Sequence, residues 1–240
     1  MRLLPIAEAI ALEGEPLSGA SPSEIEIIQN LVKETGKAVC AVTAWVIIDV
    51  IDTNSAPILA SGKQPTRGLA VLDAPLPGTA AFDRVSLDDR RVWHFHFHQA
   101  PDIPESLTAE KEAYYLERFG HDLAYNAGAI DEVTKASYVS SFSGHGGMRV
   151  GFELYRSFAA DADFYRAQLA AHGKTKIPVL ALAGESSAFS TIMKPMMEEV
   201  TEKVSFVVIS NAGHWLAEEN PSAVAQAMFN FDDSNLGHDT

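Results

Sequence analysis

The chain has 240 residues, of which 47% are apolar and 21% charged, the composition of an ordinary soluble enzyme with a sizeable core, which excludes a disordered protein. Its formal net charge of −14 repels phosphate backbones, and no apolar run reaches the roughly 18 residues of a membrane span, so we expect neither a nucleic-acid nor a membrane partner. The single cysteine, Cys40, excludes an internal disulfide and a cysteine-based zinc cage, and without a secretory-signal pattern we expect a cytoplasmic protein.

Helical patterns and short β-branched apolar runs alternate along the chain. The predicted elements are, in chain order, a helix over 23–35, strands over 39–48, 68–72 and 177–183, a helix over 188–200, a strand over 204–209 and a helix over 221–231. The strands are almost continuously apolar, which is typical of parallel strands covered on both faces. The alternation therefore predicts an α/β fold built from strand–helix–strand units.

The long segment between the second and third predicted strands has a different texture. It holds most of the aromatic residues and shows helical patterns over 108–119, 130–142, 148–158 and 161–172. Ligands of open α/β sheets bind beyond the carboxyl ends of the strands. We therefore predict a helical insertion that caps those strand ends.

Three polar side chains lie just after predicted strands. Asp73 follows Leu72 directly, Glu185 lies just after the 177–183 strand, and His214 stands on the loop after the 204–209 strand. The carboxyl ends of parallel strands meet at one edge of a sheet, so these side chains are candidates for one site. A histidine there is suited to act as a general base, although a loop histidine without a task is the simpler alternative.

Several segments, in their order along the chain, resemble the α/β-hydrolase family of epoxide hydrolases and related haloacid dehalogenases. The resemblance runs from about 69 to 231 and is carried by the segments 72–78, 93–95, 151–156, 178–185 and 213–221. It implies an α/β-hydrolase-like, mainly parallel sheet of reduced strand number with an inserted helical cap. The core would comprise 1–77 and 176–240 and the cap 78–175. No metal or organic cofactor is implied.

The resemblance also implies roles for individual residues. In that family an Asp attacks the epoxide carbon to form an ester, and a His paired with an acid activates the water that hydrolyses it. His214 matches the base and Asp73 the acid that orients it, with Glu185 as the alternative acid. We expect an Asp73–His214 hydrogen bond of about 2.6–3.2 Å.

Cap residues of the family hold the epoxide oxygen as it becomes an alkoxide. His94, in Trp-His-Phe, and Tyr155, in Phe-Glu-Leu-Tyr-Arg, match these positions. With Trp93 and Phe152 as substrate-binding neighbours, they are expected to line one mostly apolar pocket. The implied substrate is a small apolar molecule.

The nucleophile is the position at which the chain departs from the family. Asp49, at the end of the 39–48 strand, has the expected spacing to Asp73, and Asp52 is a second choice. The glycines that normally flank the nucleophile are absent, Ile48 and Ile51 crowd the turn, and no His-Gly-x-Pro oxyanion loop precedes it. The first hypothesis is therefore an epoxide hydrolase, and the alternatives are a catalytically silent relative that binds or assembles and a dehalogenase of the same mechanism.

Two further expectations concern surfaces. His94, His96 and His98 alternate, which places them on one face of an extended segment, where they would be exposed or bind a metal. The early strands of the family are missing from the sequence, which leaves one sheet edge bare and favours association into a homo-oligomer.

Overall fold

The computed structural model describes residues 68–144 and 146–235, and the elements predicted over 23–35 and 39–48 lie outside this range. Three parallel strands form the described sheet in the order β1 (Leu69–Leu72), β2 (Val179–Gly184) and β3 (Val204–Ile209). The three strands predicted within the range are therefore present. β2 is buried along its whole length, which explains its uninterrupted apolar sequence.

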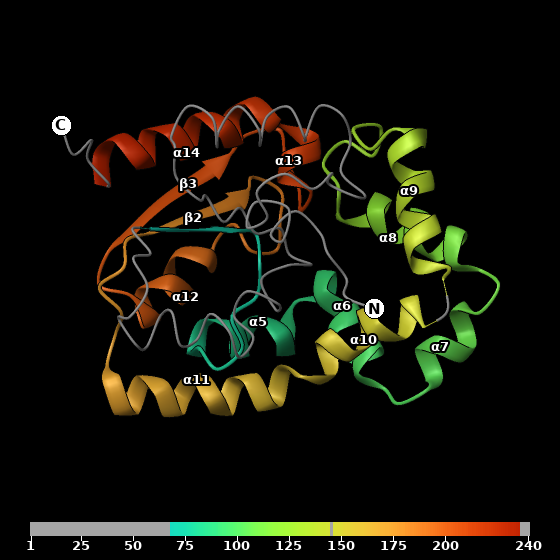
Figure 1. Cartoon of the computed structure of the whole chain (residues 1–240), viewed down its shortest axis with the longest axis horizontal. Coiled ribbons are helices and arrows are strands. Elements are labelled where there is room, and N and C mark those ends of the chain that lie inside the picture. The colour runs from blue at the N-terminus through green and yellow to red at the C-terminus, as the bar shows by residue number, and fades with distance from the viewer. Residues whose placement is uncertain (1–67, 145, 236–240) are drawn as a thin grey trace, which may run out of the picture.

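Both faces of the sheet are covered by helices. α5 (Ala80–Asp88), α11 (Phe158–His172) and α12 (Met193–Val200) lie on one side, and α14 (Pro221–Asn235) lies on the other (Figure 1). The side chains of β2 alternate between the two layers, with Ala181 in the cluster toward α5 and α12 and Leu182 in the cluster toward α14. Because a strand turns successive side chains to opposite faces, this arrangement needs apolar residues at every position.

The remaining helices stand beyond the carboxyl ends of the strands (Figure 1). They are a 3-10 turn at Arg90–Val92, α6 (Trp93–Gln99), α7 (Ile103–Thr108), α8 (Glu112–Leu123), α9 (Glu132–Phe142), α10 (Gly147–Arg156) and the short α13 (Leu216–Glu219). α6 packs against α10, and α8 against α9. We propose that the segment 78–175 forms a cap, of which α6–α10 are the part above the strand ends.

Two helix predictions differ from the structure at breaks in the chain. The helix predicted over 108–119 is divided between α7 and α8, because Glu110 adopts a left-handed backbone with φ of 62°. The helix predicted from 188 begins only at Met193, since turns occupy the residues before it. Apolar spacing does not register a single left-handed residue.

The extended segment predicted for the three histidines is wrong. These residues lie on α6, where His94, Phe95 and His98 are buried and His96 is exposed. In a helix the i and i+4 positions share a face, whereas i+2 lies away from it. Among the described residues no group of histidine, cysteine or carboxylate side chains is arranged to hold a metal ion.

Candidate active site

Asp73 is held at the carboxyl end of β1 by a left-handed turn. Its φ is 49°, its backbone N–H donates to the carbonyl of Leu182 at 2.7 Å, and its side chain is fully buried. Aspartate is among the few non-glycine residues that adopt this conformation readily. The turn directs the carboxylate toward the loops that follow β2 and β3.

Three donors surround the Asp73 carboxylate. Oδ1 accepts from the backbone N–H of Gly184 at 3.1 Å, and Oδ2 accepts from Ser187 Oγ at 2.6 Å. His214 Nδ1 lies 2.7 Å from Oδ2, within the predicted range. An ionised carboxylate only accepts hydrogen bonds, so Nδ1 of His214 carries the proton and Nε2 keeps a free lone pair. This tautomer leaves Nε2 available as a base.

The His214 loop passes so close to β2 on one side and to the end of α8 on the other that glycine is required at both approaches. A Cβ built on Gly184 would lie 1.8 Å from the carbonyl oxygen of Gly213. A Cβ on Gly213 would lie 2.4 Å from the carbonyl oxygen of Leu123. The two glycines thus let the loop after β3 reach past the end of β2, so that His214 meets Asp73 at the end of β1.

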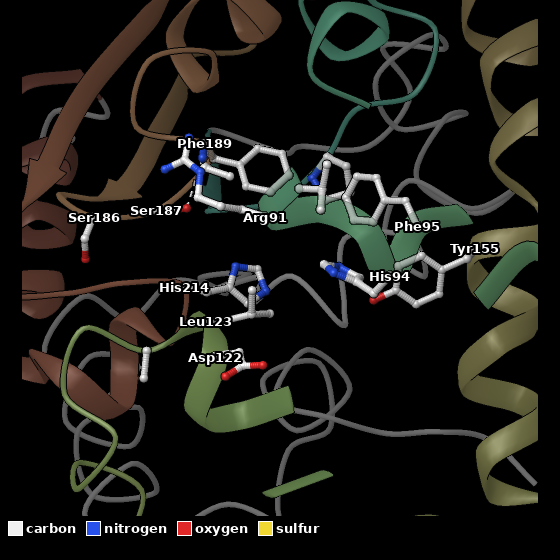
Figure 2. A pocket seen from close by; sticks show the side chains of 14 residues that line it. Arg91, His94, Phe95, Asp122, Leu123, Tyr155, Ser186, Ser187, Phe189 and His214 are labelled. Carbon is white, nitrogen blue, oxygen red and sulfur yellow. Dashed lines mark hydrogen bonds between the residues drawn. The ribbon is translucent and has the colours of Figure 1, made fainter. Parts of the chain in front are cut away.

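A cavity of about 110 Å³ opens beside the Asp73–His214 pair. In Figure 2 the rings of His214 and His94 face each other, with Tyr155 beyond His94 and Phe95 and Phe189 beside them. The cavity is lined by residues from both the sheet side and the helices above it: Pro75, Arg91, Val92, His94, Phe95, Asp122, Leu123, Ala124, Tyr155, Ser186, Ser187, Ala188, Phe189 and His214. Aromatic side chains thus flank a small set of polar groups, as in many small-molecule sites.

His94 is an uncharged hydrogen-bond donor at this cavity. Burial lowers its pKa well below the usual value, and the neighbouring His98 and His214 lower it further. Its Nδ1 is buried with no hydrogen-bond partner among the described residues. An unpaired lone pair there costs less than an unpaired N–H, so we place the proton of the neutral ring on Nε2.

Tyr155 provides a second donor on the same side. Its ring centroid lies 5.7 Å from that of His94, with the two rings nearly perpendicular. Burial raises the pKa of Tyr155 above its ordinary value, so its hydroxyl stays protonated at neutral pH. His94 and Tyr155 therefore present two neutral donors opposite the Asp73–His214 pair.

A buried polar pair lies behind these donors. His98 Nε2 is 2.5 Å from the hydroxyl of Tyr115, and the His98 ring packs 4.4 Å from the ring of Tyr155. Burial, with a smaller contribution from the charge of Arg156, lowers the pKa of His98 to about 3. His98 is therefore uncharged at neutral pH, and it packs against Tyr155 as a neutral ring.

Three expected site residues are placed elsewhere. Trp93, 46% exposed, and Phe152, which packs 4.8 Å from the ring of His98, are not among the described residues that line the cavity. Glu185 is exposed and accepts from the backbone N–H of Asn211, so it is Asp73 and not Glu185 that contacts His214. Asp49 and Asp52 lie outside the described residues.

Sequence reasoning missed four polar residues that line the cavity, namely Arg91, Asp122, Ser186 and Ser187. Ser187 binds Asp73 and lines the cavity, and Arg91 lines it while its guanidinium pairs with Asp89. Ser187 follows the end of β2 by three positions, so, like Glu185, it lies where polar side chains of a site are expected. Nothing in the local sequence singles out Arg91.

The chain is similar to several solved structures and to a curated relative. No family model matches the chain. The chain is 30% identical to the solved structure of Cfl2 from Burkholderia cenocepacia, with a TM-score of 0.67, covering 90% of this chain and 74% of that one. A solved epoxide hydrolase, CorEH, is 25% identical, with a TM-score of 0.63, covering 88% and 74%. A soluble epoxide hydrolase from Corynebacterium sp. (strain C12) is 32% identical over 141 residues, which are 58% of this chain and 48% of that relative.

The parallel sheet, the covering helices and these similarities define an α/β hydrolase. Within that family the chain belongs with the epoxide-hydrolase-like proteins, as its sequence motifs predicted. The alignment to the curated relative spans about half of that relative's length. No helix in the described part of the chain is long and apolar enough to cross a membrane.

Proposed function

We propose that the chain hydrolyses small apolar epoxides through an aspartyl ester. The observation that carries this proposal is the placement of the Asp73–His214 pair across one cavity from His94 and Tyr155. The pair supplies a base, and the two cap residues supply donors for a developing alkoxide. Phe95 and Phe189 give the cavity an apolar wall for the substrate.

In the first step a carboxylate oxygen of Asp49 bonds to an epoxide carbon as the ring C–O bond breaks. The epoxide oxygen leaves with the electron pair and takes a proton from Tyr155, while the Nε2–H of His94 donates to it. In the second step His214 Nε2 removes a proton from water, and the hydroxide attacks the ester carbonyl carbon. The ester bond to the substrate then breaks, the departing alkoxide takes the proton held on His214 Nε2, and the diol leaves. The carboxylic acid formed at Asp49 gives its proton back to the Tyr155 oxygen, which restores both side chains.

Asp73 has a supporting part in this mechanism. It holds the His214 ring by Nδ1 and stabilises the imidazolium that forms when Nε2 takes up a proton. Its own hydrogen bonds from Gly184 and Ser187 keep the carboxylate oriented.

A single turnover in ¹⁸O water tests the ester directly. Excess enzyme is mixed with styrene oxide, and both the diol and peptides of the protein are analysed by mass spectrometry. Attack of water on an ester leaves the first diol unlabelled and places ¹⁸O in the nucleophile's carboxylate. Label in Asp49 supports the proposal, and label in another carboxylate reassigns the nucleophile.

Two variants separate the steps. His214→Gln keeps a side chain of similar size but no base, so the ester should accumulate as a mass increase equal to one styrene oxide. Asp49→Asn should form no adduct. Label appearing in the first diol would exclude the ester, and absence of turnover and adduct in the folded wild type would leave a binding protein. Halide release from bromoacetate, without turnover of the epoxide, would assign a dehalogenase.

A further inference from the structure

The segment that carries His214 is bound to the helices above it at several points. The backbone N–H of His214 donates to the carbonyl of Leu123 at 2.9 Å, and Trp215 Nε1 donates to the carbonyl of Gly120 at 2.8 Å. Tyr138 of α9 donates to Glu218 at 2.8 Å. The loop that carries His214 and the end of α8 are therefore joined by hydrogen bonds, although they are far apart in the chain.

Glu219 lies at the centre of these contacts. Its Oε2 accepts from the backbone N–H of Gly213 at 2.7 Å and of Trp215 at 3.3 Å, the two residues that flank His214. Its Oε1 accepts from the backbone N–H of Asn126 at 2.7 Å, on the loop between α8 and α9. One carboxylate thus binds the backbone on both sides of His214 and also the loop between α8 and α9.

Helix capping explains part of this arrangement. A glutamate in the first turn of α13 that reaches back to the N–H groups before the helix resembles a capping box. Capping does not explain the contact with Asn126, which is 93 positions away in the sequence. The side chain therefore spans two separate segments.

We propose that Glu219 is a positioning residue, which fixes the backbone on both sides of His214 and ties that backbone to the loop after α8. This inference rests on the proposed role of His214 as the base. The geometry requires both carboxylate oxygens, because Oε2 accepts from the backbone beside His214 and Oε1 accepts from Asn126. A glutamine has one acceptor oxygen, and its NH₂ group would oppose an N–H donor, so it satisfies one side at most.

The test compares the Glu219→Gln variant with Glu202→Gln, which makes the same change of charge at an exposed site before β3. Amide hydrogen exchange of Gly213, Trp215 and Asn126 reads the contacts without any turnover. Loss of charge-assisted hydrogen bonds should speed amide exchange by about 10-fold to 100-fold on at least one side of the carboxylate, either at Gly213 and Trp215 or at Asn126. Turnover of styrene oxide should show kcat lower by about 10-fold to 100-fold with KM little changed. The NMR signal of the His214 Nδ1 proton should shift or broaden.

Failure of the inference about Glu219 can be distinguished from failure of the proposed function. Exchange equal to that of Glu202→Gln overturns the inference. Faster exchange with unchanged kcat and an unchanged His214 signal also overturns it, because Glu219 would then be a helix cap alone. If the folded wild type turns over no epoxide, the proposed function fails, while amide exchange and the His214 signal still decide whether Glu219 positions the ring. Faster exchange with a changed His214 signal supports the inference.

Discussion

His214 Nδ1 and Asp73 Oδ2 lie 2.7 Å apart, although 141 positions separate the two residues in the chain. The contact depends on the sheet, because β1 and β3 flank β2 and their carboxyl ends lie at the same edge. It also depends on two special backbone features, the left-handed turn at Asp73 and the close approach of Gly184 to Gly213. Changes at each of these features give distinct predictions.

Asp73→Asn should lower kcat strongly while leaving the fold intact. Asparagine tolerates the left-handed backbone, has the shape of aspartate and still accepts one hydrogen bond. Without the negative charge the His214 tautomer is no longer fixed, and the imidazolium loses its counter-ion, so we expect a loss of about 10²–10⁴ in rate. Steady-state kinetics with styrene oxide measure it.

The matched control for this change is Glu185→Asn. Glu185 also follows a strand end, but it contacts the Asn211 backbone and not His214. We expect its kcat to remain within about threefold of wild type, since it stands outside the proposed mechanism, with stability changes within the small range of surface substitutions. Equal losses in both variants would contradict the assignment of Asp73 as the partner of His214.

Tyr155→Phe should reduce turnover without disturbing the cap. The substitution removes one hydroxyl and keeps the ring that packs against His98 and Phe158. Loss of one donor to a developing oxyanion costs about 10²–10³ in rate. Single-turnover kinetics should show the loss in ester formation and leave ester hydrolysis unchanged.

The double variant His94→Phe with Tyr155→Phe tests whether the two donors serve one oxygen. Residues that act on the same group are non-additive, so the double variant should lose less than the product of the single losses. Multiplicative losses would indicate that His94 and Tyr155 act independently.

Gly184→Ala should destabilise the protein. Its Cβ would meet backbone atoms of Gly213 and Ala212, which lack the freedom of a side-chain tip. Overpacking of this kind costs about 1–3 kcal/mol, and the shift would also move the His214 loop. Gly120→Ala in α8 is the opposite case, because its nearest neighbour is the Ile130 side chain at 3.7 Å, and it should stabilise by about 0.5–1 kcal/mol. Urea unfolding of both variants measures the contrast.

The sequence predicts the described sheet and the site's core well, for a physical reason. Buried parallel strands need continuous apolar runs, so the strands over 68–72, 177–183 and 204–209 are visible as such runs in the sequence. Polar residues directly after such runs share one edge of the sheet. This rule and the family motif together indicate Asp73 and His214 before any coordinates are known.

The sequence predicts less where tertiary contacts override spacing. The alternating histidines fit a strand pattern, but α6 buries His94 and His98 on one helical face. Trp93 has the size of a pocket residue and nevertheless lies on the exposed side of that helix. Which side of α6 faces the cavity depends on packing against α10, and that packing is not encoded in the local pattern.

The last prediction concerns acid stability. The pKa of His98 is lowered to about 3, chiefly by burial and then by the charge of Arg156, whereas an unfolded histidine titrates near 6.5. Between these values the unfolded state binds more protons than the folded state, so stability falls as pH falls through this window and is fully present above it. His98 alone should lower the free energy of unfolding by about 2 kcal/mol between pH 7.5 and pH 5. His94 acts in the same direction, because its pKa is also lowered.

Urea unfolding of wild type, His98→Gln and His172→Gln at pH 7.5 and pH 5 measures this effect. His98→Gln loses packing against Tyr155, so its stability at pH 7.5 should be lower. The informative quantity is therefore the difference between the free energies of unfolding at pH 7.5 and at pH 5. That difference should be smaller by about 2 kcal/mol in His98→Gln. It should be unchanged in His172→Gln, because His172 is exposed at the end of α11. An equal difference in all three proteins would show that His98 takes up its proton as readily in the folded chain as in the unfolded one.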